Sequence, residues 1–128
     1  ITDLEGQGFL IEQFTVTKVN LLEDRINSHF KHVKFKMFEQ QINGGIAETC
    51  EAMVNTNGSY VPFAEANHAG KVNAGLDVIN ALSNFYGVTV PLFVDFRESV
   101  TKLIDTNNQV INLYKSAEDK KLRVELED

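Results

Sequence analysis

An acidic residue at the end of an apolar run is the strongest candidate for chemistry in this sequence. The run spans residues 88–94, Val-Thr-Val-Pro-Leu-Phe-Val, and Asp95 follows it directly. Such a run predicts a buried strand, and nucleotide-binding α/β proteins place a Mg²⁺ ligand where a strand ends at the carboxyl edge of a sheet. The same residues also fit a helix N-cap at Asp95, with Glu98 three positions later completing a capping box. Both interpretations of Asp95 stay open.

A second stretch, residues 67–76, opens a predicted helix with polar and small side chains. Its first five residues are Asn67, His68, Ala69, Gly70 and Lys71. Asn67 fits an N-cap, and the free N–H groups behind it are suited to receive a phosphate. Gly70 and Gly75 cost about 1 kcal/mol each relative to alanine inside a helix. Close approach of a ligand explains that cost, and so does tight packing of the helix on a sheet.

The hydrophobic spacing predicts the elements that must position these two stretches. Apolar residues three to five apart predict helices, and period-two or continuous apolar runs predict strands. We expect helices over 10–30, 67–85 and 98–105, and strands over 32–41, 47–55, 60–64, 88–95, 109–114 and 122–126. Asn57-Gly58 predicts a hairpin turn, and Pro62 places the second arm of that hairpin at a sheet edge.

The bulk composition predicts one soluble domain covering residues 1–128. The chain has 128 residues, 43% of them hydrophobic, and a net charge of −6. This acidic balance excludes a protein that coats nucleic acid with its whole surface. The single cysteine, Cys50, excludes an internal disulfide and a CxxC metal site, as expected in a reducing cytoplasm. No apolar run is long enough for a membrane span, and the first residue, Ile1, is compatible with a piece of a longer protein.

The remaining charged and titratable residues give weaker signals. Lys31, His32, Lys34 and Lys36 form the densest positive stretch, which we interpret as a solvated strand face rather than a DNA contact. His29, His32 and His68 are too scattered for an HxxH or HExxH metal site, so we expect surface or capping roles for them.

The order of these segments resembles a known family. A helix, a β-hairpin, a small-residue helix start, a strand ending at Asp95 and the run 109–113 look like the C-terminal lobe of ABC-type ATPase heads of SMC and SbcC DNA-repair proteins, including bacterial and phage-related members. The resemblance extends over nearly the whole chain. It implies that residues 67–71 replace the Leu-Ser-Gly-Gly-Glu signature, which touches the γ-phosphate of nucleotide on the opposite head. It also implies that Asp95 matches the Walker B aspartate, which holds Mg²⁺.

Four departures from the family pattern limit the chemistry that this resemblance implies. Phe96 occupies the position of the glutamate that polarises the attacking water, which leaves Glu98 as a displaced substitute. Asn67 stands where the signature serine stands, and the two signature glycines are not kept. No histidine follows residues 109–113, and Lys115 lies nearest to the expected switch position. The GxxxxGK[ST] phosphate loop does not occur, so we do not expect this chain to hydrolyse ATP alone.

The resemblance implies a C-terminal half of a P-loop head, α/β or α+β in class, with a short, mostly parallel sheet packed by helices. Residues 1–31 would form a coiled-coil stump and residues 32–128 the lobe proper. The complete protein would use ATP and Mg²⁺, would pair with an N-terminal ATPase lobe, and would contact DNA. A homodimer is expected, because a half-sheet exposes an edge and an apolar face. We also expect a cytoplasmic protein that makes no membrane contact.

Two other function classes stay open. Phe96 and the missing switch histidine favour a structural or oligomerisation module without nucleotide chemistry. A metal-dependent nuclease would use Asp95, Glu98 and Asp105 as carboxylate ligands, which requires the three acids to converge.

Overall fold

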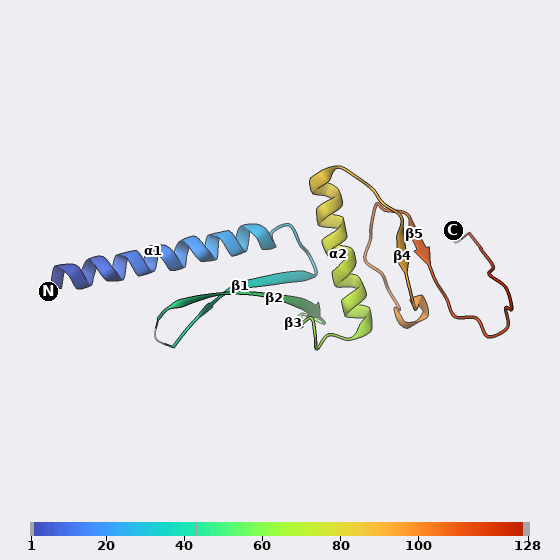
Figure 1. Cartoon of the computed structure of the whole chain (residues 1–128), viewed down its shortest axis with the longest axis horizontal. Coiled ribbons are helices and arrows are strands. Elements are labelled where there is room, and N and C mark those ends of the chain that lie inside the picture. Colours follow the sequence, from blue (N-terminus) through green and yellow to red (C-terminus); the bar gives the residue numbers. More distant parts are fainter. Residues whose placement is uncertain (1, 43, 127–128) are drawn as a thin grey trace.

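The computed structural model describes residues 2–42 and 44–126, which form two helices and two small sheets (Figure 1). In chain order the elements are α1 (Thr2–Asn27), β1 (Val33–Gln40), β2 (Ile46–Thr56), β3 (Ser59–Pro62), α2 (His68–Tyr86), β4 (Leu92–Val94), the 3₁₀ turn η1 (Arg97–Ser99) and β5 (Val110–Asn112). The chain is therefore a mixed α/β structure, which confirms the fold class at that coarse level.

The first sheet is antiparallel, in the order β1-β2-β3. Asn57 and Gly58, with φ of 54° and 90°, form the tight turn between β2 and β3. Two consecutive residues with positive φ are the requirement of a type I′ hairpin turn, and Asn-Gly meets it at low cost. Pro62 ends β3 at the edge of the sheet, opposite Met53. The hairpin and its edge arm are confirmed.

Helix α1 lies along the outer edge of β1 and supplies partners for its backbone. The Asn27 side chain accepts a hydrogen bond from the Phe35 N–H at 2.7 Å and donates one to the Phe35 carbonyl at 2.9 Å. The Glu23 carboxylate accepts from the Met37 N–H at 2.9 Å. Because these groups occupy the backbone of β1, that edge is closed to another strand.

Helix α1 extends further toward the N-terminus than its spacing predicts, and it ends at Asn27 rather than Phe30. Gly6 and Gly8 are included in it. No helix in the part of the chain that the structure describes is both long and apolar enough to cross a membrane.

Helix α2 packs on the antiparallel sheet and joins the two halves of the fold. Ala74 and Val78 pack with Val33 and Val54, the two most buried valines of the sheet. At its C-terminus Gly87 has φ of 65° and its N–H bonds the Ser83 carbonyl, which is the left-handed cap that glycine favours. The helix expected over 67–85 is confirmed within one residue at its C-terminal end.

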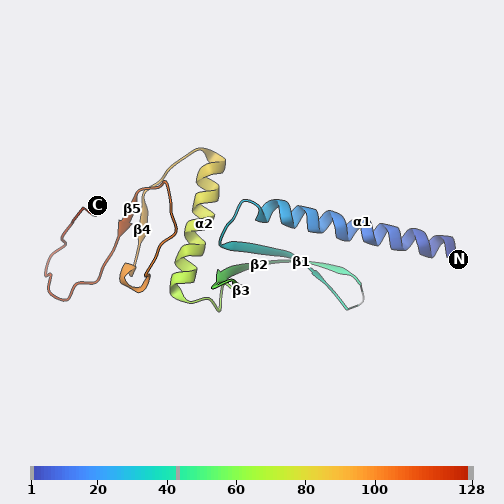
Figure 2. The ribbon, with the colours of Figure 1, turned by 180° about the vertical axis from the view of Figure 1, so that it is seen from behind.

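The second sheet is a parallel pair, β4 with β5, on the other side of α2 (Figures 1 and 2). The expectation of one mostly parallel sheet is therefore wrong, because the three N-terminal strands pair antiparallel among themselves. Residues 88–91 stay outside β4: Pro91 lacks an N–H, and the Val90 N–H donates to the Asn108 side chain at 2.8 Å instead of to a strand.

Two further elements expected from the sequence are not formed. Residues 98–105 form only the short turn η1 and then an extended segment, which side chains of α2 hold in place. Asn73 accepts from the Ile104 N–H at 3.0 Å, and Asn80 donates to the Asp105 carbonyl at 2.9 Å. Residues 122–126 form no strand in the described chain, and all five are exposed, so their apolar alternation does not become part of a sheet.

Candidate functional site

The start of α2 and the turn after β4 lie together in space. The ring of His68 meets the ring of Phe96 edge to face, with centroids 5.7 Å apart. A connection of only a few residues joins the end of α2 to the start of β4, so the two elements run in opposite directions (Figure 1). Asp95, at the carboxyl end of β4, is therefore brought to the N-terminal end of α2. The two stretches singled out in the sequence share one site.

The hydrogen bonds at the start of α2 leave two backbone donors available. The Asn67 side chain accepts from the Gly70 N–H at 2.7 Å, and the Asn67 carbonyl accepts from the Lys71 N–H at 2.9 Å. Within the described chain, the N–H groups of His68 and Ala69 have no acceptor. Asn67 is thus the N-cap that the sequence predicts, and the helix keeps two donors directed toward solvent.

Gly70 is explained by packing rather than by a ligand. A Cβ at this position would lie 3.0 Å from the Asn67 side-chain oxygen and 3.6 Å from Val54. The glycine therefore permits the capping bond and the close approach of α2 to β2. Gly75 has open space around it, so packing does not require it there.

The cap itself is expected to contribute measurably to stability. Replacing Asn67 with alanine removes the acceptor of the Gly70 N–H, and such losses cost about 1 kcal/mol. Asn67→Asp should keep the bond and be at least as stable, because a negative charge is favourable at a helix N-terminus. Urea unfolding followed by circular dichroism compares the three proteins. Equal midpoints for Asn67→Ala and the wild type would show that the cap is not formed in solution.

Lys71 is held on the loop that precedes α2. Its ammonium group donates to the Ala64 carbonyl at 3.0 Å and lies 5.7 Å from the centre of the Phe63 ring. These contacts tie the cation to residues 63–64. Lys71 therefore places a positive charge beside the helix start without capping it.

Asp95 is exposed, and its turn is fixed by backbone hydrogen bonds. One carboxylate oxygen accepts from the Phe96 N–H at 2.8 Å, and the Arg97 N–H donates to the Leu113 carbonyl at 3.1 Å. Phe96 has φ of 54°, a left-handed conformation that costs an aromatic residue about 1–3 kcal/mol. Phe96, not Asp95, precedes the turn η1, and no side chain caps it. The capping box of Asp95 with Glu98 is therefore wrong, which leaves the second carboxylate oxygen of Asp95 without a partner among the described residues.

The acids proposed as nuclease ligands do not converge. Asp105 bonds through its carbonyl to Asn80, which lies about 18 Å along α2 from His68 at 1.5 Å per residue. Glu98 is exposed on η1 near Asp95. Within residues 2–42 and 44–126, no three His, Cys, Asp or Glu side chains are grouped to hold a metal ion. The three carboxylates that the nuclease hypothesis requires therefore do not form a metal site.

Comparison with known proteins finds no relative of this chain. No protein-family model, curated protein or solved structure matches the chain.

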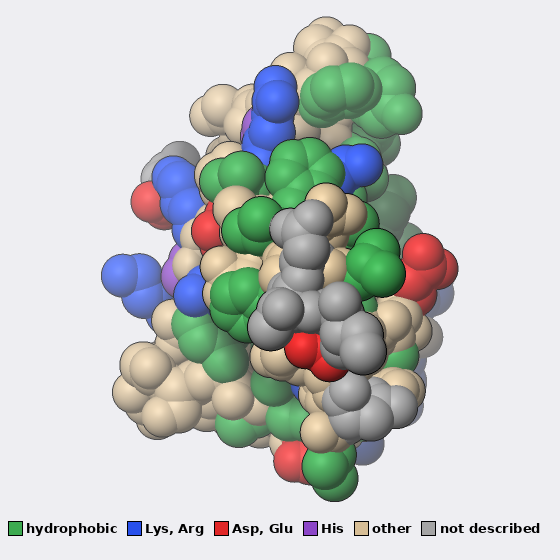
Figure 3. All heavy atoms as spheres, turned by 90° about the vertical axis from the view of Figure 1, so that its left-hand side faces the viewer, with side chains coloured by type: hydrophobic (Ala, Val, Ile, Leu, Met, Phe, Trp, Pro, Cys, Tyr) green, Lys and Arg blue, Asp and Glu red, His purple; other side chains and the backbone are tan. Residues whose placement is uncertain are grey.

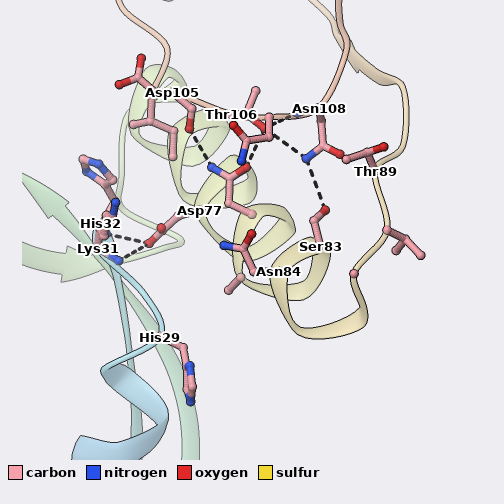
Figure 4. A pocket seen from close by; sticks show the side chains of 16 residues that line it. His29, Lys31, His32, Asp77, Ser83, Asn84, Thr89, Asp105, Thr106 and Asn108 are labelled. Atoms are coloured by element: carbon pink, nitrogen blue, oxygen red, sulfur yellow. Dashed lines mark hydrogen bonds between the residues drawn. The ribbon is translucent and has the colours of Figure 1, made fainter.

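A polar pocket lies at the opposite end of α2, and the sequence analysis did not identify it. The pocket, of about 550 Å³, lies between the connection from α1 to β1, the C-terminal half of α2 and residues 104–108 (Figure 4). Asp77, Asn80 and Asn84 line it from one face of α2. Their spacing of three and four was a detectable signal, because it places three polar residues on one face of the helix, apart from its apolar face.

Hydrogen bonds within the pocket fix its walls. The buried carboxylate of Asp77 accepts from the N–H groups of Lys31, His32 and Val33 at 2.8, 2.7 and 3.0 Å. On the other wall, Asn108 donates to the Ser83 hydroxyl at 3.3 Å (Figure 4). Most of the polar groups on α2 are therefore engaged in holding the two flanking segments in place.

Proposed function

We propose that this chain is the C-terminal lobe of an ATP-binding head of the SMC and SbcC type, which completes a nucleotide site only together with an N-terminal lobe. The observation that carries the proposal is the contact between Phe96 and His68, which places the turn after β4, with Asp95 in it, beside the start of α2 at the carboxyl end of the parallel pair β4–β5. Ligands of open α/β sheets bind at the carboxyl ends of the strands.

Each residue of the site has a role in this proposal. The N–H groups of His68 and Ala69, at the positive end of the α2 dipole, would receive the γ-phosphate of a nucleotide bound between paired heads. Asp95 would hold Mg²⁺ through the carboxylate oxygen that makes no other contact. Lys71 adds positive charge beside the phosphate position, and Glu98 is the nearest candidate for orienting the attacking water.

The small size of the parallel sheet supports the proposal that an N-terminal lobe completes it. Parallel sheets are normally covered on both faces and contain more than two strands. In β4, Leu92 and Val94 are buried, whereas Phe93 points to the opposite face and is 67% exposed. An N-terminal lobe that adds strands and covers Phe93 would bury this face. We further propose that the complete protein is cytoplasmic, associates with DNA and acts through two paired ATPase heads.

Slow hydrolysis is expected even in the complete head. Phe96 cannot polarise water, and it packs on His68 at the position where the family pattern has glutamate. A structural role without turnover remains the second candidate, because Phe96 and the lack of a histidine after β5 both remove groups used in hydrolysis.

Reassembly of the head tests the proposal. The chain alone should not bind Mg·ATP, whereas co-expression with an N-terminal lobe carrying GxxxxGK[ST] should give a stable complex that binds it in calorimetry. Phe93→Glu should prevent assembly by placing a charge on the face to be covered. Phe85→Glu, at a residue 78% exposed near the end of α2, is the matched control and should assemble normally. A complex that forms with Phe93→Glu, or that fails to bind Mg·ATP, contradicts the proposal.

A further inference from the structure

Helix α1 carries a stripe of apolar side chains on the side away from the hairpin. We define the outer stripe as Leu4, Leu10, Ile11, Phe14, Leu21 and Leu22, which are between 48% and 74% exposed. At about 100° per residue, these positions share a face roughly 120° wide. Val16, Val19 and Ile26 lie on the other side of the helix and are partly buried. Figure 3 looks onto the end of the molecule where α1 begins, and hydrophobic side chains lie there among charged ones.

The outer stripe is large enough for a stable interface. Burying six such side chains removes on the order of 600 Å² of apolar surface from water in each chain. Two chains together would bury about 1,200 Å², which is the lower limit of specific, stable protein interfaces. Monomeric proteins rarely leave so large an apolar patch in water.

We propose that the outer stripe binds the outer stripe of a second copy of this chain, with the two α1 helices antiparallel. This inference does not rest on the proposed nucleotide function. When Leu4 of each copy faces Leu21 of the other, Ile11 faces Phe14 of the other copy, so the central contacts are apolar on both sides. Such self-complementary pairing is what a two-fold dimer requires.

The polar residues within the outer stripe favour the antiparallel direction. Lys18 lies between Phe14 and Leu21, and Gln7 lies between Leu4 and Leu10. In the antiparallel register Lys18 of one copy faces Gln7 of the other, whose amide oxygen accepts from the ammonium group. In a parallel pair Lys18 would face Lys18 of the second copy, and two like charges at a helix interface repel each other.

Sedimentation of the purified chain tests the dimer. Because an interface of this size belongs to the lower end of the stable class, the wild type should be dimeric at about 100 µM. Phe14→Glu should weaken the dimer by at least about 100-fold, because the charge is buried in both copies. The matched control is Phe9→Glu, since Phe9 is 60% exposed on another face of α1 and should change the affinity by less than about threefold. Circular dichroism checks that both variants keep their helices. A monomeric wild type, or equal effects of the two variants, overturns the proposal.

Disulfide trapping tests the direction of the helices. In a Cys50→Ser background, Leu4→Cys and Leu21→Cys chains are mixed and oxidised, so that the introduced thiols are the only ones present. The antiparallel dimer predicts cross-links between the two different variants. Cross-links of each variant with itself would show a parallel pair, and the absence of any cross-link would show that the outer stripes of two copies do not pair; either result overturns the proposal.

Discussion

Replacing Asp77 with alanine should destabilise the chain by about 3 kcal/mol, because one carboxylate holds three backbone donors. The N–H groups of Lys31, His32 and Val33 all bond the same oxygen of Asp77, which is only 4% exposed. Without the Asp77 carboxylate, water that enters the polar pocket can hydrate the N–H group of the exposed Lys31. Val33 is 2% exposed, so its N–H would stay buried without an acceptor. The connection between α1 and β1 would then lose its attachment to α2.

Two comparisons separate this effect from a general loss of charge. Asp77→Asn keeps an acceptor oxygen but not the charge, so it should lose about half as much stability as the alanine variant. Asp105→Ala removes an exposed carboxylate from the same pocket and should stay within about 0.5 kcal/mol of the wild type. Urea unfolding gives the free energies, and hydrogen exchange at Val33 reports the local opening. If Asp77→Ala and Asp105→Ala have the same midpoint, the three-donor contact does not hold the fold together.

Local signals in the sequence predicted the elements that local chemistry determines. Asn57-Gly58 specified its turn because both residues tolerate positive φ, and Asn67 marked the start of α2. The extended segment 100–108 could not be found in this way. Its conformation depends on hydrogen bonds to Asn73, 31 residues before Ile104, and to Asn80, 25 residues before Asp105. Long-range side-chain bonds of this kind overrode the helical spacing of residues 98–105.

The parts of the candidate site at Asp95 and the start of α2 were predictable from the sequence, but their proximity was not. The sequence identified both Asp95 and the start of α2, but not that His68 and Phe96 would be in contact, since no spacing rule relates residues that far apart. The pairing of β1 with β2 was also hidden, because alternation specifies a strand but not its partners. The polar pocket was missed because α2 was predicted from the spacing of its apolar residues alone. The amide side chains that line the pocket, which hold neighbouring segments in place, did not enter that prediction.

In the reassembled head, Asp95→Asn should weaken nucleotide binding at least about tenfold when Mg²⁺ is present. The substitution keeps the size of the side chain and an oxygen that can accept from the Phe96 N–H, so the turn should survive. What it removes is the negative charge on the free oxygen, which is the group proposed to hold the metal. Calorimetric titration with ATP, in Mg²⁺ and again in EDTA, measures the two affinities.

The metal dependence of the loss decides its cause. A lost Mg²⁺ ligand lowers affinity in Mg²⁺ and leaves the affinity in EDTA almost unchanged, whereas a disturbed turn lowers both. Asp105→Asn is the matched control, because that carboxylate lies at the far end of α2 and should change neither affinity. If Asp95→Asn binds Mg·ATP as tightly as the wild type, Asp95 is not a metal ligand. The start of α2 would then have to act through its N–H groups and Lys71 alone, as a phosphate contact without a metal-binding acid beside it.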